Sequence, residues 1–176
     1  MLELMAGREP GTAYPSLALP EPGQQDDLLL FQQWLETAIP MAGRFGMQRL
    51  YWQDATLLCD VHLAPNLNDK GTGFGGSLMA QSTLLGWCWT TLWLRARGFR
   101  RDVVIAEATQ RFLAPVTADY RLSCRAAEPE EPTRFAAQLD AHGKGRIKLV
   151  QQIHVDDRLC FEAIGDYAAR PVGRRT

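Results

Sequence analysis

The sequence predicts an α+β fold in which a curved antiparallel sheet surrounds one long buried helix. Three observations lead to this prediction. Residues 77–94 carry no charge and have the length and composition of a helix. Two strand-like segments precede this run, and almost everything after it is strand-like. The 176 residues show no internal repeat and no dividing linker, and they suffice for one domain with a core.

A first helix is expected at the start of the domain. Asp26 or Asp27 can cap its first turn, and apolar residues recur at helical spacing from Leu28 to Ala38. Pro40 ends it, because the residue before a proline avoids helical backbone. Residues 1–25, rich in proline and glycine and without a targeting pattern, are expected to be a flexible or loosely docked tail.

Turn signals divide the remaining chain into strands. Strands are expected at 47–52 and 56–63 before the long helix, and at 103–114, 120–126, 134–142, 146–155 and 159–169 after it. Gly143-Lys144-Gly145 predicts a hairpin between 134–142 and 146–155, and residues 156–158 predict a second tight turn. One domain is therefore expected over 26–170, with a C-terminal tail over 171–176.

Composition excludes several classes of function. A net charge of −1 gives no bulk attraction to nucleic acid. The four cysteines are widely spaced without a CxxC pair, which favours reduced, buried thiols in a cytoplasmic protein over zinc or disulfides. The uncharged run begins with glycines and contains serines, threonines and a glutamine, which favours a buried helix over a membrane span. No metal and no cofactor is expected.

The segment from Asn66 to Gly76 is the most informative part of the chain. It holds four glycines within residues 71–76 and leads directly into the uncharged helix. The free N–H groups of a helix start favour negative charge or a polarised carbonyl oxygen. Three of the glycines also spell G-x-G-x-x-G, but the mostly β chain that follows excludes a dinucleotide-binding unit.

Two motifs resemble those of hotdog-fold thioesterases. Asn68-x-x-Gly71-x-x-Phe74-Gly75-Gly76 resembles the loop and helix start of thioesterases related to phenylacetate-pathway enzymes, and residues 112–116 (Phe-Leu-Ala-Pro-Val) resemble a strand end of hotdog thioesterases. The whole loop, with Gly-Trp at 86–87, resembles the thioesterase domain fused to acetyltransferases in some bacteria. The resemblance spans roughly 26–169 and implies the hotdog fold and activity on acyl thioesters.

The catalytic residues implied by the resemblance include backbone and amide donors but only one carboxylate and no histidine. The N–H groups of Gly75 and Gly76 would polarise the thioester carbonyl, Asn68 would add an amide donor, and Asp69 is the nearest carboxylate. Thr83 stands where relatives carry a catalytic acid, and it can only position water. Histidines of the family pattern are replaced by asparagine at 66 and phenylalanine at 74.

This lack of a base leaves three activities open. Hydrolysis needs a base or a nucleophile. Decarboxylation of malonyl-acyl carrier protein, known among members resembling this narrower group, needs only stabilisation of a thioester enolate, and it would supply acetyl groups for fatty-acid synthesis. A non-catalytic acyl-binding module is the third possibility.

Further residues near the loop are expected to contact the substrate: Asn66, Lys70, Thr72, Phe74, Ser77, Gln81 and Arg111. The expected partner is an acyl carrier protein or a coenzyme A thioester. Arginines at the exit of the long helix either dock that partner or form a solvated helix end. Tryptophans 87, 89 and 93 serve core packing or a dimer interface. Hotdog relatives also imply a homodimer or dimer of dimers, with Asn68 facing the partner's helix.

Overall fold

A computed structural model describes residues 8–173 of the chain. Its elements, in chain order, are helices, short 3₁₀ turns and strands: α1 Leu28–Ala38, η2 Ala42–Arg44, β1 Met47–Gln53, β2 Thr56–Val61, η3 Ala64–Asn66, α2 Gly75–Arg95, β3 Arg101–Phe112, β4 Tyr120–Ala126, α3 Glu131–His142, β5 Gly145–Val155 and β6 Arg158–Pro171. The predicted α+β arrangement is confirmed.

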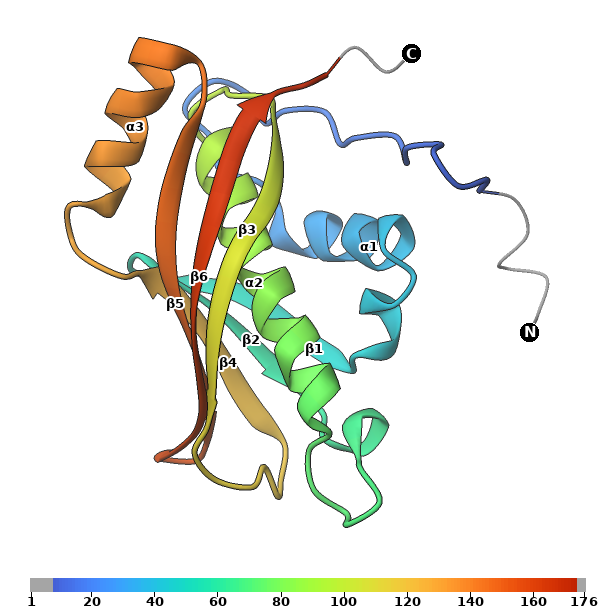
Figure 1. Ribbon diagram of the computed structural model, residues 1–176. Helices are drawn as coiled ribbons and strands as arrows, with labels where there is room; N and C mark the ends of the chain where they lie inside the picture. Colours follow the sequence, from blue (N-terminus) through green and yellow to red (C-terminus); the bar gives the residue numbers. More distant parts are fainter. Residues whose placement is uncertain (1–7, 174–176) are drawn as a thin grey trace.

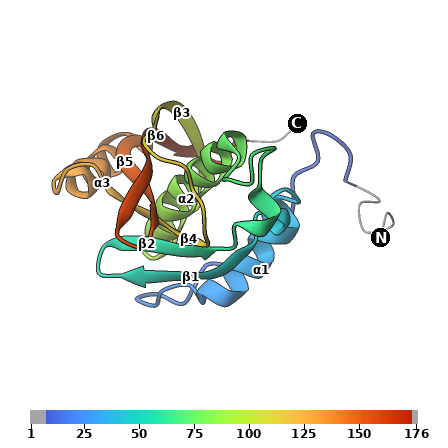
Figure 2. The ribbon, with the colours of Figure 1, turned by 90° about the horizontal axis from the view of Figure 1, so that it is seen from below.

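The strands form one antiparallel six-stranded sheet in the order β1-β2-β4-β5-β6-β3. Figures 1 and 2 show this sheet curving around α2, with α1 and α3 on opposite sides of the molecule. The helix α2 packs against the strands of this sheet, and its Trp89 contacts Trp52 of β1. A charged side chain at such a position would be costly to desolvate, which explains why the helix is uncharged before Arg95.

The start of α1 is capped as the sequence predicts, whereas Arg95, one of the arginines expected to be solvated or to dock a partner, is mostly buried. Asp27 caps α1 by accepting hydrogen bonds from the N–H groups of Leu29 and Leu30 at 2.9 and 3.2 Å. Arg95, in the last turn of α2, forms an ion pair with Asp26 at 2.7 Å, in which both side chains are at most one-tenth exposed. This pair joins the start of α1 to the end of α2.

The predicted strand over 134–142 is wrong, and so is the hairpin at 143–145. Residues 131–142 form the helix α3, which buries Phe135 and Leu139 one turn apart. Gly143 ends this helix in the left-handed conformation, with φ of 66°, and its N–H donates to the carbonyl of Leu139. The glycine therefore terminates a helix instead of turning a hairpin.

Tryptophans 89 and 93 confirm the core-packing interpretation, because both are at least nine-tenths buried. Trp89 donates from its indole N–H to the carbonyl of Ala55 at 3.1 Å, so its polar atom is satisfied. All four cysteines are buried and unpaired, as predicted. No helix among residues 8–173 has the length and hydropathy needed to cross a bilayer.

Gly86 lies where α2 approaches β6 most closely. A Cβ atom placed on it would lie 2.1 Å from the hydroxyl oxygen of Tyr167, which donates to the carbonyl of Thr83 at 3.0 Å.

We expect Gly86→Ala to destabilise the protein by about 1–3 kcal/mol in urea unfolding, although alanine favours helices. The double variant Gly86→Ala/Tyr167→Ala should lose less than the sum of the single variants. If the losses in the free energy of unfolding were additive, the contact between residues 86 and 167 would not limit how closely α2 approaches β6.

Candidate active site

The loop that precedes α2 is fixed by its backbone. The N–H of Phe74 donates to the carbonyl of Asn66 at 2.7 Å, which closes the loop at its base. The N–H of Gly73 donates to the carbonyl of Val116 at 2.8 Å, which ties the loop to the segment after β3. These two bonds set the position at which the helix begins.

Asn68 stabilises the tip of this loop with its side chain. Its Oδ1 accepts from the N–H groups of Lys70 and Thr72 at 2.8 and 3.0 Å, and its Nδ2 donates to the Thr72 hydroxyl at 2.9 Å. This is an Asx turn with an additional contact. Nδ2 also lies 3.5 Å from the carbonyl of Gly73, so both of its N–H bonds have acceptors within the loop, and donation to a substrate would have to displace one of them.

Asn66 and Gln81 lie in the interior and bind each other. Gln81 donates from Nε2 to Oδ1 of Asn66 at 2.7 Å, and the Tyr120 hydroxyl donates to Oε1 of Gln81 at 2.6 Å. Burial raises the pKa of the Tyr120 hydroxyl well above its ordinary value, which keeps it protonated as a donor. Asn66 also donates to two backbone carbonyls. The chain of bonds therefore connects the loop, α2 and β4.

The charged candidates lie toward solvent, and Ser77 is half-buried. Asp69 and Lys70 pair with each other at 3.0 Å, and both side chains are at least three-quarters exposed. Ser77 donates its hydroxyl to the carbonyl of Phe74 at 2.9 Å. Arg111 lies on β3, 3.8 Å from the carboxylate of Glu162 on β6, and its side chain is mostly exposed.

Gly75 and Gly76 are the first two residues of α2, whose N–H groups lack acceptors within the helix. Two aromatic rings flank them. A Cβ on Gly76 would lie 2.6 Å from the ring of Phe74, and one on Gly75 would lie 3.1 Å from the ring of Phe112. The absence of side chains at these two positions therefore lets the rings of Phe74 and Phe112 pack against the helix start.

A groove of about 490 Å³ begins at this helix start. One face of α2 lines it, at positions 76, 79, 80, 83, 84 and 87. Ile39, Met41 and Phe45 form one wall, and Ile105 and Gln110 of β3 form the other. We call this space the α2 groove. Its largely apolar lining suits an acyl chain, and its polar side chains are Thr83 and Gln110.

The structure thus brings together only some of the predicted site residues. Gly76 and Thr83 line the same groove, and Phe74 and Gly75 adjoin its start. Within residues 8–173, the lining of the groove includes no carboxylate, histidine or cysteine. Burial raises the pKa of Cys59 and Cys124 to about 12, which excludes either as a thiolate nucleophile.

The groove walls contain residues that the sequence did not indicate as site residues. Met41, Phe45 and Ile105 come from segments far from the glycine loop, and Phe112 was noted only as part of a strand end. Met79, Ala80, Leu84 and Trp87 could have been found from helical spacing, since they follow Gly76 and Thr83 on one face.

An antiparallel sheet around a long helix, with a glycine-rich helix start opening into an apolar groove, defines a hotdog-fold protein of the thioesterase class. A family model described as "Putative thioesterase (yiiD_Cterm)" matches residues 29–171. The chain belongs to this family.

Solved structures agree with this assignment. A "putative thioesterase" from Shewanella oneidensis is 30% identical, with 82% of this chain and 97% of that chain covered and a TM-score of 0.73. A protein of unknown function from Chlorobaculum tepidum is 26% identical, with 82% and 94% covered and a TM-score of 0.74. A thioesterase from Haemophilus influenzae, at 11% identity, covers 88% and 98% with a TM-score of 0.68 and shares the fold.

Removal of the Tyr120 hydroxyl tests the buried hydrogen-bond chain. Tyr120→Phe leaves the Oε1 of Gln81 buried without its donor, so we expect a loss of about 1–3 kcal/mol in the free energy of unfolding. Tyr51→Phe is the matched control, because the Tyr51 hydroxyl makes only a long 3.5 Å bond to Asp60 and its loss should cost less than about 0.5 kcal/mol. If both variants lost the same free energy of unfolding in urea, the buried hydrogen bonds of Asn66, Gln81 and Tyr120 would have no special role in stability.

Proposed function

We propose that the protein acts on acyl thioesters, with the carbonyl oxygen at the N–H groups of Gly75 and Gly76 and the acyl chain in the α2 groove. One observation carries the proposal: the groove starts at the residue whose N–H is available, so the polar and apolar parts of a thioester meet complementary surfaces. Aligned backbone dipoles at the helix start add to the stabilisation of a developing negative charge.

Membership in a thioesterase family supports hydrolysis as the first candidate reaction. Water would attack the carbonyl carbon and lose a proton to solvent or a base, and the oxyanion would accept hydrogen bonds at the helix start. The C–S bond would then break, releasing the carboxylic acid and a thiolate that takes up a proton from solvent. Thr83, half-buried in the groove, is the side chain that could hold the attacking water. Asp69, the nearest carboxylate in sequence, would have to exchange its pairing with Lys70 to act as base.

Decarboxylation of a malonyl thioester is the second candidate, and the lining of the groove favours it. The bond to the carboxylate carbon would break, carbon dioxide would leave, and the electron pair would form an enolate whose oxygen lies at the helix start. Protonation from solvent would then give the acetyl thioester. This sequence needs enolate stabilisation and no strong base, which fits a groove whose polar side chains are a threonine and a glutamine.

The thioester is expected on an acyl carrier protein or on coenzyme A, in the cytoplasm. Mass spectrometry of malonyl-, acetyl- and long-chain acyl-carrier protein, and of the coenzyme A esters, tests the proposal. Free thiol carrier from the acyl forms would support hydrolysis, and acetyl carrier from the malonyl form alone would support decarboxylation. Binding without product would instead support an acyl-binding module, and neither binding nor product would contradict the proposal.

Two substitutions at one position separate the roles of Asn68. Asn68→Asp keeps the acceptor for both N–H groups of the loop, whereas Asn68→Ala removes it. If Asn68 acts through the loop, Asp should retain activity within about tenfold of wild type, and Ala should lose about 10²-fold, as when an oxyanion donor is misplaced. Equal losses in kcat/KM would assign the amide N–H to the substrate.

We also propose that two copies pair along β3. This strand is twelve residues long, lies at the end of the sheet, and exposes Val104 and Ile105. A long, partly apolar edge strand favours pairing with another strand. Because Ile105 and Gln110 also line the α2 groove, a second copy on this edge would cover the open side of the groove.

Ala106 offers a test of this pairing. It is exposed at an irregularity of β3 and has no aligned partner on β6, so a charge there should not disturb the protomer. We expect light scattering after gel filtration to give a dimer for the wild type and a monomer for Ala106→Asp, with reduced activity. Gln33→Asp, on the exposed face of α1, is the control and should stay dimeric. A monomeric wild type would contradict the pairing.

A further inference from the structure

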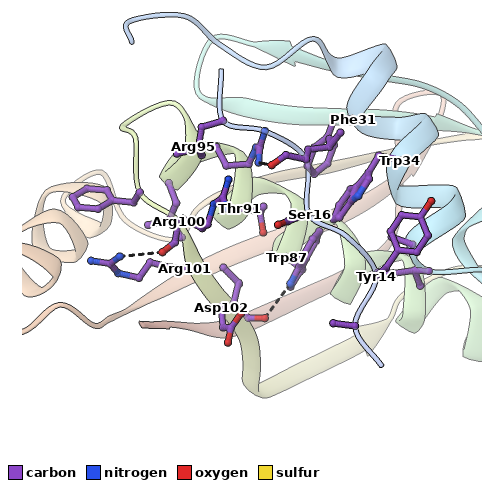
Figure 3. A pocket seen from close by; sticks show the side chains of 18 of the residues that line it. Tyr14, Ser16, Phe31, Trp34, Trp87, Thr91, Arg95, Arg100, Arg101 and Asp102 are labelled. Carbon is purple, nitrogen blue, oxygen red and sulfur yellow. Dashed lines mark hydrogen bonds between the residues drawn. The ribbon is translucent and has the colours of Figure 1, made fainter. Parts of the chain in front are cut away.

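A second cavity of about 280 Å³ adjoins the α2 groove at Trp87. Residues 13–19, which we call the strap, cover it, and Figure 3 shows Trp34 and Trp87 side by side with Thr91 and Ser16 next to them. Leu94 and Val103 add to its apolar floor. The cavity therefore lies between the strap, α1, α2 and the beginning of β3.

The two cavities share part of their lining. Ile39 and Trp87 line both of them. Gly76, Thr83, Trp87 and Thr91 are spaced by seven, four and four residues, so they lie on one face of α2. The groove and the second cavity are consequently two parts of one trough along the helix, divided at Trp87.

Trp87 is held firmly at this division. Its indole N–H donates to the carbonyl of Val103 at 3.0 Å, and its ring stacks on Trp34 at 6.3 Å between centroids with 18° between planes. Trp34 in turn donates to the carbonyl of Pro15 in the strap at 2.8 Å. Rotating the Trp87 ring away would break its bond to Val103 and its stacking on Trp34.

The strap is anchored to the helix behind Trp87. The guanidinium of Arg95 donates to the carbonyls of Leu17 and Ala18 and pairs with Asp26. Arg8 donates to the carbonyl of Ala38 at the end of α1. The cover over the second cavity is thus fixed at several points along its length.

We infer that Trp87 sets the maximum length of the acyl chain and that the strap seals the unused space behind it. The inference rests on the proposed function, because it assigns the chain to the α2 groove. The chain would enter at Gly76 and end at the Trp87 ring, eleven residues along α2, or roughly 16 Å. Removing the ring would join the groove to the second cavity and lengthen the accepted chain.

Binding of S-alkyl pantetheine thioethers of increasing chain length tests this inference without turnover. Pantetheine is the arm that carrier proteins and coenzyme A share, and a thioether cannot be hydrolysed. By calorimetry, wild-type affinity should rise with chain length and then fall at least tenfold beyond a limit. Trp87→Ala should move that limit to longer chains, and Trp87→Phe should move it less while disturbing the fold less.

A refilling variant and a distant control make the test specific. In Trp87→Ala/Thr91→Phe, an aromatic ring one turn further along α2 fills the second cavity, so the limit should return toward that of the wild type. Trp52→Phe alters a tryptophan that packs on Trp89, outside the trough, and should leave the limit unchanged.

The outcomes separate this inference from the proposed function. A wild-type protein that binds no thioether and converts no acyl thioester would overturn the proposed function and the inference with it. A wild type that binds with no length limit, or folded Trp87 variants that keep the wild-type limit, would overturn only the inference. The same shift in Trp52→Phe would also overturn it, since the limit would then not depend on the trough.

Discussion

The buried hydrogen-bond chain from Asn66 through Gln81 to Tyr120 is the constraint on which the site depends. It passes from the glycine loop to α2 and on to β4, so it connects three elements that are distant in sequence. Each of these amide groups is buried and would be costly to leave unpaired. The bonds therefore fix how α2 is rotated about its axis, and that rotation directs Gly76 and Thr83 into the groove.

The second feature that determines the site is the absence of charged residues on α2 before Arg95. A helix enclosed by a sheet can carry small polar groups that bond to its own backbone, as the Thr90 hydroxyl does to the carbonyl of Gly86. An ionised side chain would need a buried partner. The chemistry available along this helix therefore comes from backbone dipoles and neutral side chains, which suits polarisation of a carbonyl better than proton transfer.

Much of the fold could be predicted from local signals. The uncharged run and the cap at Asp27 led to α2 and α1 because their causes lie within a few residues of sequence. The helix α3 was missed although Pro132 stands in its first turn and Phe135 and Leu139 have helical spacing. Its many polar residues, followed by glycines at 143 and 145, resemble the pattern of a β-hairpin.

Only part of the candidate site could be predicted from local signals. The glycine motif located the helix start, but the side-chain bonds of Asn68 and the interior position of Gln81 depend on how the loop folds back on itself. The walls at Met41, Phe45 and Ile105 depend on the register of β3 against β6 and on the path after α1. No local pattern encodes such long-range pairings, so the groove could only be seen once the chain was folded.

The anchoring of the strap also bears on which residues stabilise the end of α2. Arg95 is nine-tenths buried and divides its hydrogen bonds between Asp26 and the carbonyls of Leu17 and Ala18. A fragment starting at residue 26 would retain the carboxylate but leave part of the guanidinium without acceptors. Residues 17 and 18 therefore contribute to the stability of the fold, and a truncation designed from secondary structure alone would remove part of what stabilises the last turn of α2.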